Sequence, residues 1–179
     1  AGDDSVAYRG TEVSIAGGAG ANTLVLNAAV NVNLGAADQT SGDSVNVTAF
    51  QNIDASALDV AHPVTLVGST GANVITGGAG ADTIDGAGGV DAISAGAGAD
   101  LVTYRGAETS IDGGAGADTL TLAASGGITA VDFSVASGLD QTTGDGVAVA
   151  NFENLDAGAV STNLTVAGSS GANTITTGA

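Results

Sequence analysis

The chain has 179 residues, of which 44% are hydrophobic but only 3% aromatic, so any interior must be thin and built from small aliphatic side chains. Nineteen carboxylates face two arginines and no lysine, which leaves a formal net charge of −17. This charge excludes nucleic acid as a partner and disfavours anionic membrane surfaces. The chain has no cysteine, which excludes disulfides and thiolate metal sites, and no apolar run long enough to span a bilayer.

A long repeat of about 100 residues organises the chain. Three pairs of segments match, 1–26 with 97–122, 38–55 with 140–157, and 68–76 with 168–176, at offsets of 96, 102 and 100. Internal similarity of this kind is the signature of a repeat architecture. The chain also lacks methionine and starts inside a motif, so we expect a fragment of a longer protein whose targeting signals lie elsewhere.

A shorter period of nine residues runs through residues 68–121. The eighth residue of each nonapeptide is aliphatic: Ile75, Ile84, Ile93, Val102, Ile111 and Leu120. This spacing fits neither a helical face nor a long alternating strand, but it fits a short strand followed by a tight glycine turn. Two nonapeptides then form one coil of eighteen residues, and residues eighteen apart stack at the usual strand separation of about 4.8 Å.

In chain order, five segments are expected: a partial repeat block at 1–26, an irregular β-solenoid segment at 27–67, a full repeat block at 68–122, a second irregular segment at 123–167, and the start of a further block at 168–179. The irregular segments lack the nine-residue register, yet their apolar residues alternate as in strands, for example Val30, Val32 and Leu34. We expect them to continue the solenoid as irregular coils. A small β-sandwich between the blocks would show similar alternation.

The sixth position of the nonapeptide carries the side chains that a metal site needs. Steps of eighteen bring pairs of these residues together: Asp82 with Asp100, Asp100 with Asp118, Asn73 with Asp91, and Asp4 with Asn22. Glycine turns can take positive φ and direct their carbonyl oxygens inward. A cage of carboxylate and carbonyl oxygens without nitrogen or sulfur donors favours a hard divalent cation, and a flexible, water-poor cage favours calcium over magnesium.

Two nonapeptides, GGAGADTID from Gly77 and GGAGADTLT from Gly113, match the pattern GGxGxDxUx in full, where U is aliphatic. The chain therefore resembles the RTX (repeats-in-toxin) proteins over residues 68–121, and partially over 1–25 and 168–179. The resemblance implies an all-β, right-handed parallel β-roll or β-solenoid, in which 18-residue coils bind several calcium ions between consecutive turns and irregular β-helical coils separate the blocks.

The same resemblance implies ligands. The site between turns 77–82 and 95–100 would combine the carboxylates of Asp82 and Asp100 with carbonyls of Gly77, Ala79, Gly96 and Gly98. Asp118, Asp91 and Asp4 are further candidate ligands. Asn22 and Asn73 offer a neutral oxygen, so sites that depend on them should be weaker or empty. Residues 104–112 have Thr109 in place of aspartate and are expected to pack without binding.

The leading hypothesis for function is structural: a calcium-binding repeat segment of a large secreted or cell-surface protein, such as an adhesin, a surface-layer or a matrix component, that folds and stiffens in extracellular calcium. Its partners would be calcium and other repeats of the same long chain, with self-assembly and contacts to a cell surface or polysaccharide as further options. The resemblance implies export by a type I secretion system.

The alternative hypothesis is a non-catalytic, calcium-binding tail of a type I-secreted hydrolase or epimerase. Catalysis within this chain is not expected, because lysine is absent and neither arginine nor the single histidine, His62, lies in an acid-rich turn. We expect no membrane insertion. An ice-binding face would need a regular threonine array, and the threonines are too sporadic for one.

Overall fold

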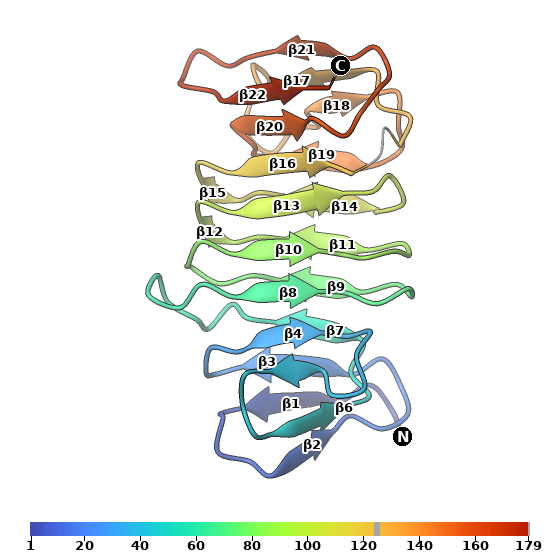
Figure 1. Ribbon diagram of the computed structural model, residues 1–179, viewed down its shortest axis with the longest axis vertical. Coiled ribbons are helices and arrows are strands. Elements are labelled where there is room, and N and C mark those ends of the chain that lie inside the picture. Colours follow the sequence, from blue (N-terminus) through green and yellow to red (C-terminus); the bar gives the residue numbers. More distant parts are fainter. Residues whose placement is uncertain (124–125, 179) are drawn as a thin grey trace.

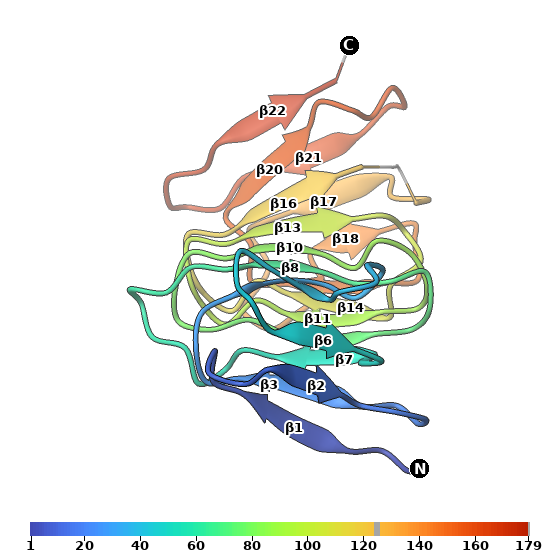
Figure 2. The same cartoon turned by 60° about the horizontal axis from the view of Figure 1, so that its bottom comes forward.

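A computed structural model describes residues 1–123 and 126–178, and within these ranges the chain forms twenty-two short strands and no helix. The strands lie as rungs along one long axis, with the two chain ends at opposite ends of the molecule (Figure 1). Two large sheets, parallel except for β5 at the edge of the second, lie on opposite sides of the axis, as the tilted view in Figure 2 shows.

The first large sheet contains, in order across the sheet, β1 (Ser5–Tyr8), β3 (Thr23–Leu26), β7 (Asn52–Asp54), β9 (Val74–Thr76), β11 (Ala92–Ser94), β14 (Ser110–Asp112) and β19 (Ala148–Ala150). The second contains β22 (Ile175–Thr177), β20 (Asn154–Ala157), β16 (Thr119–Leu122), β13 (Leu101–Tyr104), β10 (Thr83–Asp85), β8 (Thr65–Val67), β4 (Asn31–Asn33) and β5 (Thr40–Ser41). Three small sheets complete the fold: β12 (Ala97–Gly98) with β15 (Ala115–Gly116), β2 (Ser14–Ala16) with β6 (Asn46–Thr48), and β17 (Ala130–Asp132) between β18 (Thr142–Thr143) and β21 (Thr165–Ala167).

Parallel pairing in the repeat block follows a register of eighteen residues. Ile84 pairs with Val102 in the second sheet, and Ile93 pairs with Ile111 in the first. The predicted coil of two nonapeptides is therefore confirmed, and with it the β-roll. Because side chains alternate across a strand, the residue in the middle of each short strand points inward.

The core is a narrow ribbon of aliphatic side chains between the two large sheets. In the first sheet the stacked residues are Leu24, Ile53, Ile75, Ile93, Ile111 and Val149, and in the second they are Leu66, Ile84, Val102, Leu120 and Leu155. All are at most 2% exposed. These are the aliphatic positions of the nonapeptides, extended into the irregular segments.

The irregular segments continue the roll rather than form a separate sandwich. Leu24 pairs with Ile53, and Leu120 pairs with Leu155, so each pairing spans more than one regular coil. The extra residues fold into short antiparallel hairpins, β4 with β5 and β17 with β18. The boundaries of the five expected segments stay a prediction.

A buried glutamine anchors each hairpin to the roll. The Gln39 amide nitrogen donates to the Phe50 carbonyl at 2.9 Å, and its amide oxygen accepts the Phe50 N–H at 2.9 Å. Gln141 makes the same two bonds to Phe152, at 2.9 and 2.8 Å. Each glutamine thus satisfies backbone groups that have no strand partner where the sheet hydrogen bonding is interrupted.

Successive long repeats lie on opposite sides of the roll. Strands β3, β7 and β9 of the first repeat belong to the first sheet, whereas their counterparts β16, β20 and β22 belong to the second. The long repeat therefore advances by an odd number of half-coils, and each unit is turned by half a revolution relative to the one before.

Candidate calcium sites

One edge of the roll carries a ladder of three aspartates in the turns that precede β10, β13 and β16. This edge includes β12 and β15, on the left in Figure 1. Asp82, Asp100 and Asp118 are at most 1% exposed. Their Oδ1 atoms accept the N–H of the residue eighteen positions earlier, at 2.9 Å from Val64, 2.7 Å from Asp82 and 2.8 Å from Asp100. The coil register thus brings these carboxylates together as the sequence predicted.

The second carboxylate oxygen decides what this ladder can bind. Oδ2 of Asp82 accepts the Gly78 N–H at 2.8 Å. Oδ2 of Asp100 and Oδ2 of Asp118 are buried and have no hydrogen-bond partner. A buried charged oxygen without a partner is strongly unfavourable, so a cation is the natural complement to these two atoms. The residues present therefore fit a bound divalent ion.

Glycine allows the turns of successive coils to approach closely enough to share an ion. Gly96 has a φ of 105°, and a Cβ built there would lie 2.2 Å from the Gly78 carbonyl oxygen. Among the carbonyls proposed as ligands, that of Gly96 also accepts the Ala115 N–H at 2.8 Å. Gly77 and Ala79 lie in the turn before β10, and Gly98 is the last residue of β12, just before β13. The assignment of all four as ligands stays a prediction.

Carbonyls are needed because the side chains alone do not surround an ion. Among the residues that the structure describes, no three histidine, aspartate or glutamate side chains gather closely enough to hold a metal. A metal site on this edge would have to combine two carboxylates with backbone oxygens, which is a donor set suited to calcium.

The opposite edge carries the other predicted ligands, with fewer charges. Asp91 is 1% exposed, and its Oδ1 accepts the Asn73 N–H at 2.9 Å. On its other side Thr109 donates its N–H and its hydroxyl to the Asp91 carbonyl, at 2.7 and 2.9 Å. Asp4 is exposed, and its N–H donates to Oδ1 of Asn22 at 3.0 Å. Among the described residues, the other buried carboxylate on this edge is Glu108, and desolvation, with the neighbouring Glu108 charge, raises the pKa of Asp91.

The two asparagines use their amide nitrogens where a carboxylate could not. Asn22 Nδ2 donates to three carbonyl oxygens, and Asn73 Nδ2 donates to the Gln51 carbonyl. An amide N–H group and a cation compete for the same carbonyl oxygens. These contacts give both amide nitrogens partners without a metal, and the weak or empty sites expected at Asn22 and Asn73 stay a prediction.

A buried glutamate closes the turn that lacks the aspartate motif. The Glu108 carboxylate accepts the N–H groups of Arg105, Gly106 and Ala107 at 2.9, 2.8 and 3.0 Å. Glu12 plays the same part after the first Tyr-Arg-Gly triplet. Sequence reasoning missed this role, although glutamate stands at the fifth position of both segments.

Burial also changes the protonation of the ladder. Desolvation raises the pKa of Asp100 to about 7 and the pKa of Asp118 to about 6, and neighbouring carboxylates add to both shifts. An acid with a raised pKa keeps its proton more readily in the folded chain than in the unfolded chain. Without a cation, the folded ladder therefore favours protonated aspartates.

Calcium-free protein is expected to become less stable as the pH rises from about 4 to about 8. The stabilising protonation is fully present below the unfolded pKa of 3.8 and is lost as the pH passes through the folded values of about 6 and about 7. Thermal unfolding in calcium-stripped buffers across this range measures the effect. Saturating calcium should remove the dependence, because metal ligands must be deprotonated. A flat calcium-free profile would contradict the expectation.

The family model for the RTX calcium-binding nonapeptide repeat matches residues 65–102 and 110–124, in four copies. This segment is a block of RTX calcium-binding nonapeptide repeats. Such repeats bind calcium ions, several in each repeat region. The three ladder aspartates and Asp91 all lie within the matched residues of the RTX block. A search of curated proteins found no match to the chain.

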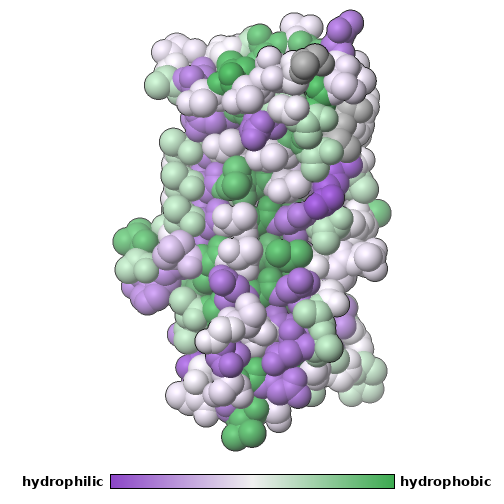
Figure 3. Space-filling model, viewed as in Figure 1, coloured by the Kyte–Doolittle hydropathy of each residue, from purple (hydrophilic) through white to green (hydrophobic). Residues whose placement is uncertain are grey.

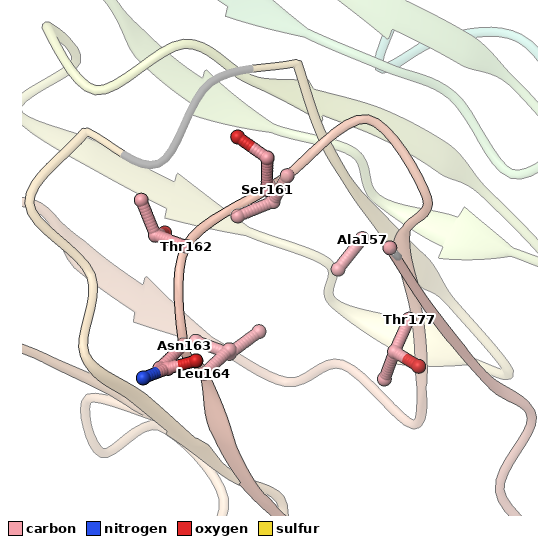
Figure 4. Close-up of a pocket in the computed structure, with 8 residues that line it drawn as sticks. Ala157, Ser161, Thr162, Asn163, Leu164 and Thr177 are labelled. Carbon is pink, nitrogen blue, oxygen red and sulfur yellow. The ribbon is translucent and has the colours of Figure 1, made fainter.

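Two hollows on the roll have linings without an acid–base pair, and a smaller hollow of about 150 Å³ contains the exposed pair of Asp59 and His62. One hollow of about 270 Å³ lies at the C-terminal coils and is lined by small and polar residues, among them Ser161, Thr162 and Asn163 (Figure 4). Its lining includes no titratable side chain. An open groove of about 370 Å³ on the first sheet includes one, Asp112. Neither lining pairs an acid with a base, and RTX repeats are structural rather than catalytic.

Proposed function

We propose that this chain is a calcium-stabilised structural segment of a large secreted or cell-surface protein of the adhesin, surface-layer or matrix type. The observation that carries the proposal is the ladder of buried aspartates, in which Asp100 and Asp118 each keep one oxygen without a hydrogen-bond partner. An ion between successive turns would join the coils along the axis and neutralise their charges. The segment would then act as a stiff rod.

The charge of the chain supports a requirement for external cations. Within the described residues, two ion pairs involve side chains, Arg105 with Asp85 at 2.7 Å and His62 with Asp59 at 2.6 Å. Most of the nineteen carboxylates therefore have no cationic side chain beside them, and the formal net charge is −17. Calcium sites of extracellular modules have dissociation constants of about 10⁻⁴ to 10⁻³ M, so the fold would be much less stable at low calcium and would be completed outside the cell.

The surface agrees with a solvated rod. Exposed large hydrophobic residues such as Val13, Val60 and Leu139 come from segments far apart in the sequence. On the face shown in Figure 3, hydrophobic residues are interspersed with hydrophilic ones. Within the described residues, no helix is both long and apolar enough to cross a bilayer.

A calcium titration followed by circular dichroism tests the proposal, with magnesium as the control ion. Calcium is expected to produce β-structure and a large rise in melting temperature, and magnesium much less of either. The triple variant Asp82→Ala, Asp100→Ala, Asp118→Ala should need far more calcium for the same signal. A wild-type chain that is equally folded and equally heat-resistant in excess chelator would sink the proposal.

A further inference from the structure

The ladder continues past the RTX block into a residue outside the nonapeptide pattern. After β16 the next strand in the second sheet is β20, and the intervening chain loops away and returns. In the turn before β20, Oε2 of Glu153 accepts the Asp118 N–H at 2.9 Å. Glu153 thus occupies the place that Asp118 occupies relative to Asp100 one coil earlier. It lies outside the residues that match the RTX repeat.

The first long repeat contains the same junction with neutral side chains. Asn22 stands where the second repeat has Asp118, and Gln51 stands where it has Glu153. Gln51 Oε1 accepts the Asn22 N–H at 2.8 Å, as Glu153 does for Asp118. The Asn22 and Asp118 carbonyls each accept two N–H groups from the returning turn. The two junctions are therefore built alike and differ in charge.

In the neutral junction an amide nitrogen occupies the centre of the turn. Asn22 Nδ2 donates to the carbonyl oxygens of Gly18, Gly20 and Ala49, at 3.2, 3.4 and 3.3 Å. The Asp4 N–H donates to Oδ1 of the same Asn22 side-chain amide and so fixes the orientation of that amide. Three carbonyls from two coils thus converge on one positively polarised group.

The charged junction has the same backbone. Gly18 and Gly114 have φ values of 83° and 90°, and Gly20 and Gly116 have values of 130° and 153°. In the returning turns, Ala49 and Asn151 have values of 63° and 60°, which are unusual for residues with a side chain. A Cβ built on Gly17 would lie 2.3 Å from the Ala49 carbonyl oxygen, and a Cβ built on Gly113 would lie 2.2 Å from the Asn151 carbonyl oxygen. From this likeness we infer that the carbonyls of Gly114, Gly116 and Asn151 are directed in the second repeat as those of Gly18, Gly20 and Ala49 are in the first.

Asp118 cannot complete this arrangement on its own. Its Oδ1 accepts the Asp100 N–H, as Asn22 Oδ1 accepts the Asp4 N–H, so Oδ2 takes the place of the amide nitrogen. Oδ2 is buried and has no hydrogen-bond partner. An ionised carboxylate oxygen that faces carbonyl oxygens, with a second carboxylate from Glu153 close by, is strongly unfavourable unless a cation lies between them.

We propose that Asp118 and Glu153 hold a divalent cation together with the carbonyls of Gly114, Gly116 and Asn151, at the junction between the RTX block and the irregular coil that follows. The donors are all oxygens, and three of them are backbone carbonyls of glycine-rich turns, which favours calcium over magnesium because magnesium keeps several of its waters. This site rests on the proposed function and extends it, because it joins a segment without nonapeptides to the calcium-bound roll. In the first repeat, Asn22 and Gln51 build the same junction without metal.

The number of bound calcium ions, measured by native mass spectrometry and by equilibrium dialysis, tests this site. Glu153→Gln is expected to bind one ion fewer than wild type. In excess calcium it should melt at a lower temperature, and in chelator at the same or a higher temperature, because the charge beside Asp118 is gone. Asp156→Asn is the matched control, since Asp156 is exposed on β20, the strand that follows Glu153, and its ion count should be unchanged.

The reverse substitutions in the first repeat test the same geometry, because they should create a metal site there. The double variant Asn22→Asp, Gln51→Glu is expected to bind at least one ion more than wild type. If wild type binds calcium, and Glu153→Gln binds the same number of ions and melts as wild type does, the junction site alone is overturned. Wild type that binds no calcium would overturn the proposed function itself.

Discussion

Replacement of Asp100 by alanine is expected to destabilise the calcium-saturated chain more than any other single change in the ladder. Asp100 contacts the coil before it through Oδ1 and the coil after it through its own N–H. Its loss therefore weakens two adjacent sites. An ion at about 100 times its dissociation constant contributes about 2.7 kcal/mol, so two sites contribute about 5 kcal/mol. For a chain of this size the melting temperature would fall by roughly 10 to 20 °C.

The amide variant separates metal binding from hydrogen bonding at this position. Asp100→Asn keeps an oxygen for the Asp82 N–H and places an N–H group where Oδ2 lies, as Asn22 does. We expect it to lose calcium like Asp100→Ala but to be more stable than wild type in chelator. Differential scanning calorimetry with calcium and with chelator distinguishes the three chains. Equal melting of wild type and Asp100→Ala in saturating calcium would show that Asp100 is not a ligand.

The second large effect is expected at Gly114, where alanine should disrupt the stacking of coils. Gly114 has a φ of 90°, and a Cβ built there would lie 2.0 Å from the Gly96 carbonyl oxygen. The backbone contact cannot be relieved by a change of rotamer. Overpacking in a close-packed site costs about 1–3 kcal/mol or more, and the left-handed backbone conformation adds about 1 kcal/mol. Chemical denaturation in excess calcium measures the sum.

Two glycines serve as matched controls for this variant. Gly18 holds the equivalent position in the first repeat, with a φ of 83° and no atom within 4 Å of a built Cβ. Gly18→Ala therefore reports the backbone strain without the contact. Gly88 also has open space around a built Cβ, and its φ lies outside the left-handed region. The expected order of destabilisation is Gly114→Ala, then Gly18→Ala, then Gly88→Ala, and equal effects at Gly114 and Gly18 would contradict the importance of coil contact.

Periodicity in the sequence predicted the parts of the fold that depend on local spacing. Aliphatic residues nine apart predicted the inward columns, and the coil of eighteen residues predicted which aspartates share an edge. Asp82, Asp100 and Asp118 lie together for that reason. The family pattern then identified the metal as calcium. In each case a constant number of residues separates the interacting groups.

The partners of the irregular segments could not be predicted in the same way. Glu153 reaches Asp118 across 35 residues, and the corresponding span from Asn22 to Gln51 is 29 residues. Loops of different length can lead to the same register, so spacing alone does not identify the pair. Gln39 and Gln141, which anchor the hairpins through Phe50 and Phe152, were missed for the same reason.

By itself, the sequence determined a thin aliphatic roll with an acidic edge, because its strands, turns and carboxylates recur at a constant interval along a single axis. Only the tertiary structure decided which oxygens lack partners and which side chains meet across the loops. Hydrogen-bond satisfaction depends on atoms that distant segments bring together. The same backbone turn is closed by an amide at Asn22 and left with an unpartnered oxygen at Asp118. Asparagine and aspartate differ here in one side-chain atom, nitrogen or oxygen. That difference matters because folding brings carbonyl oxygens close to the atom.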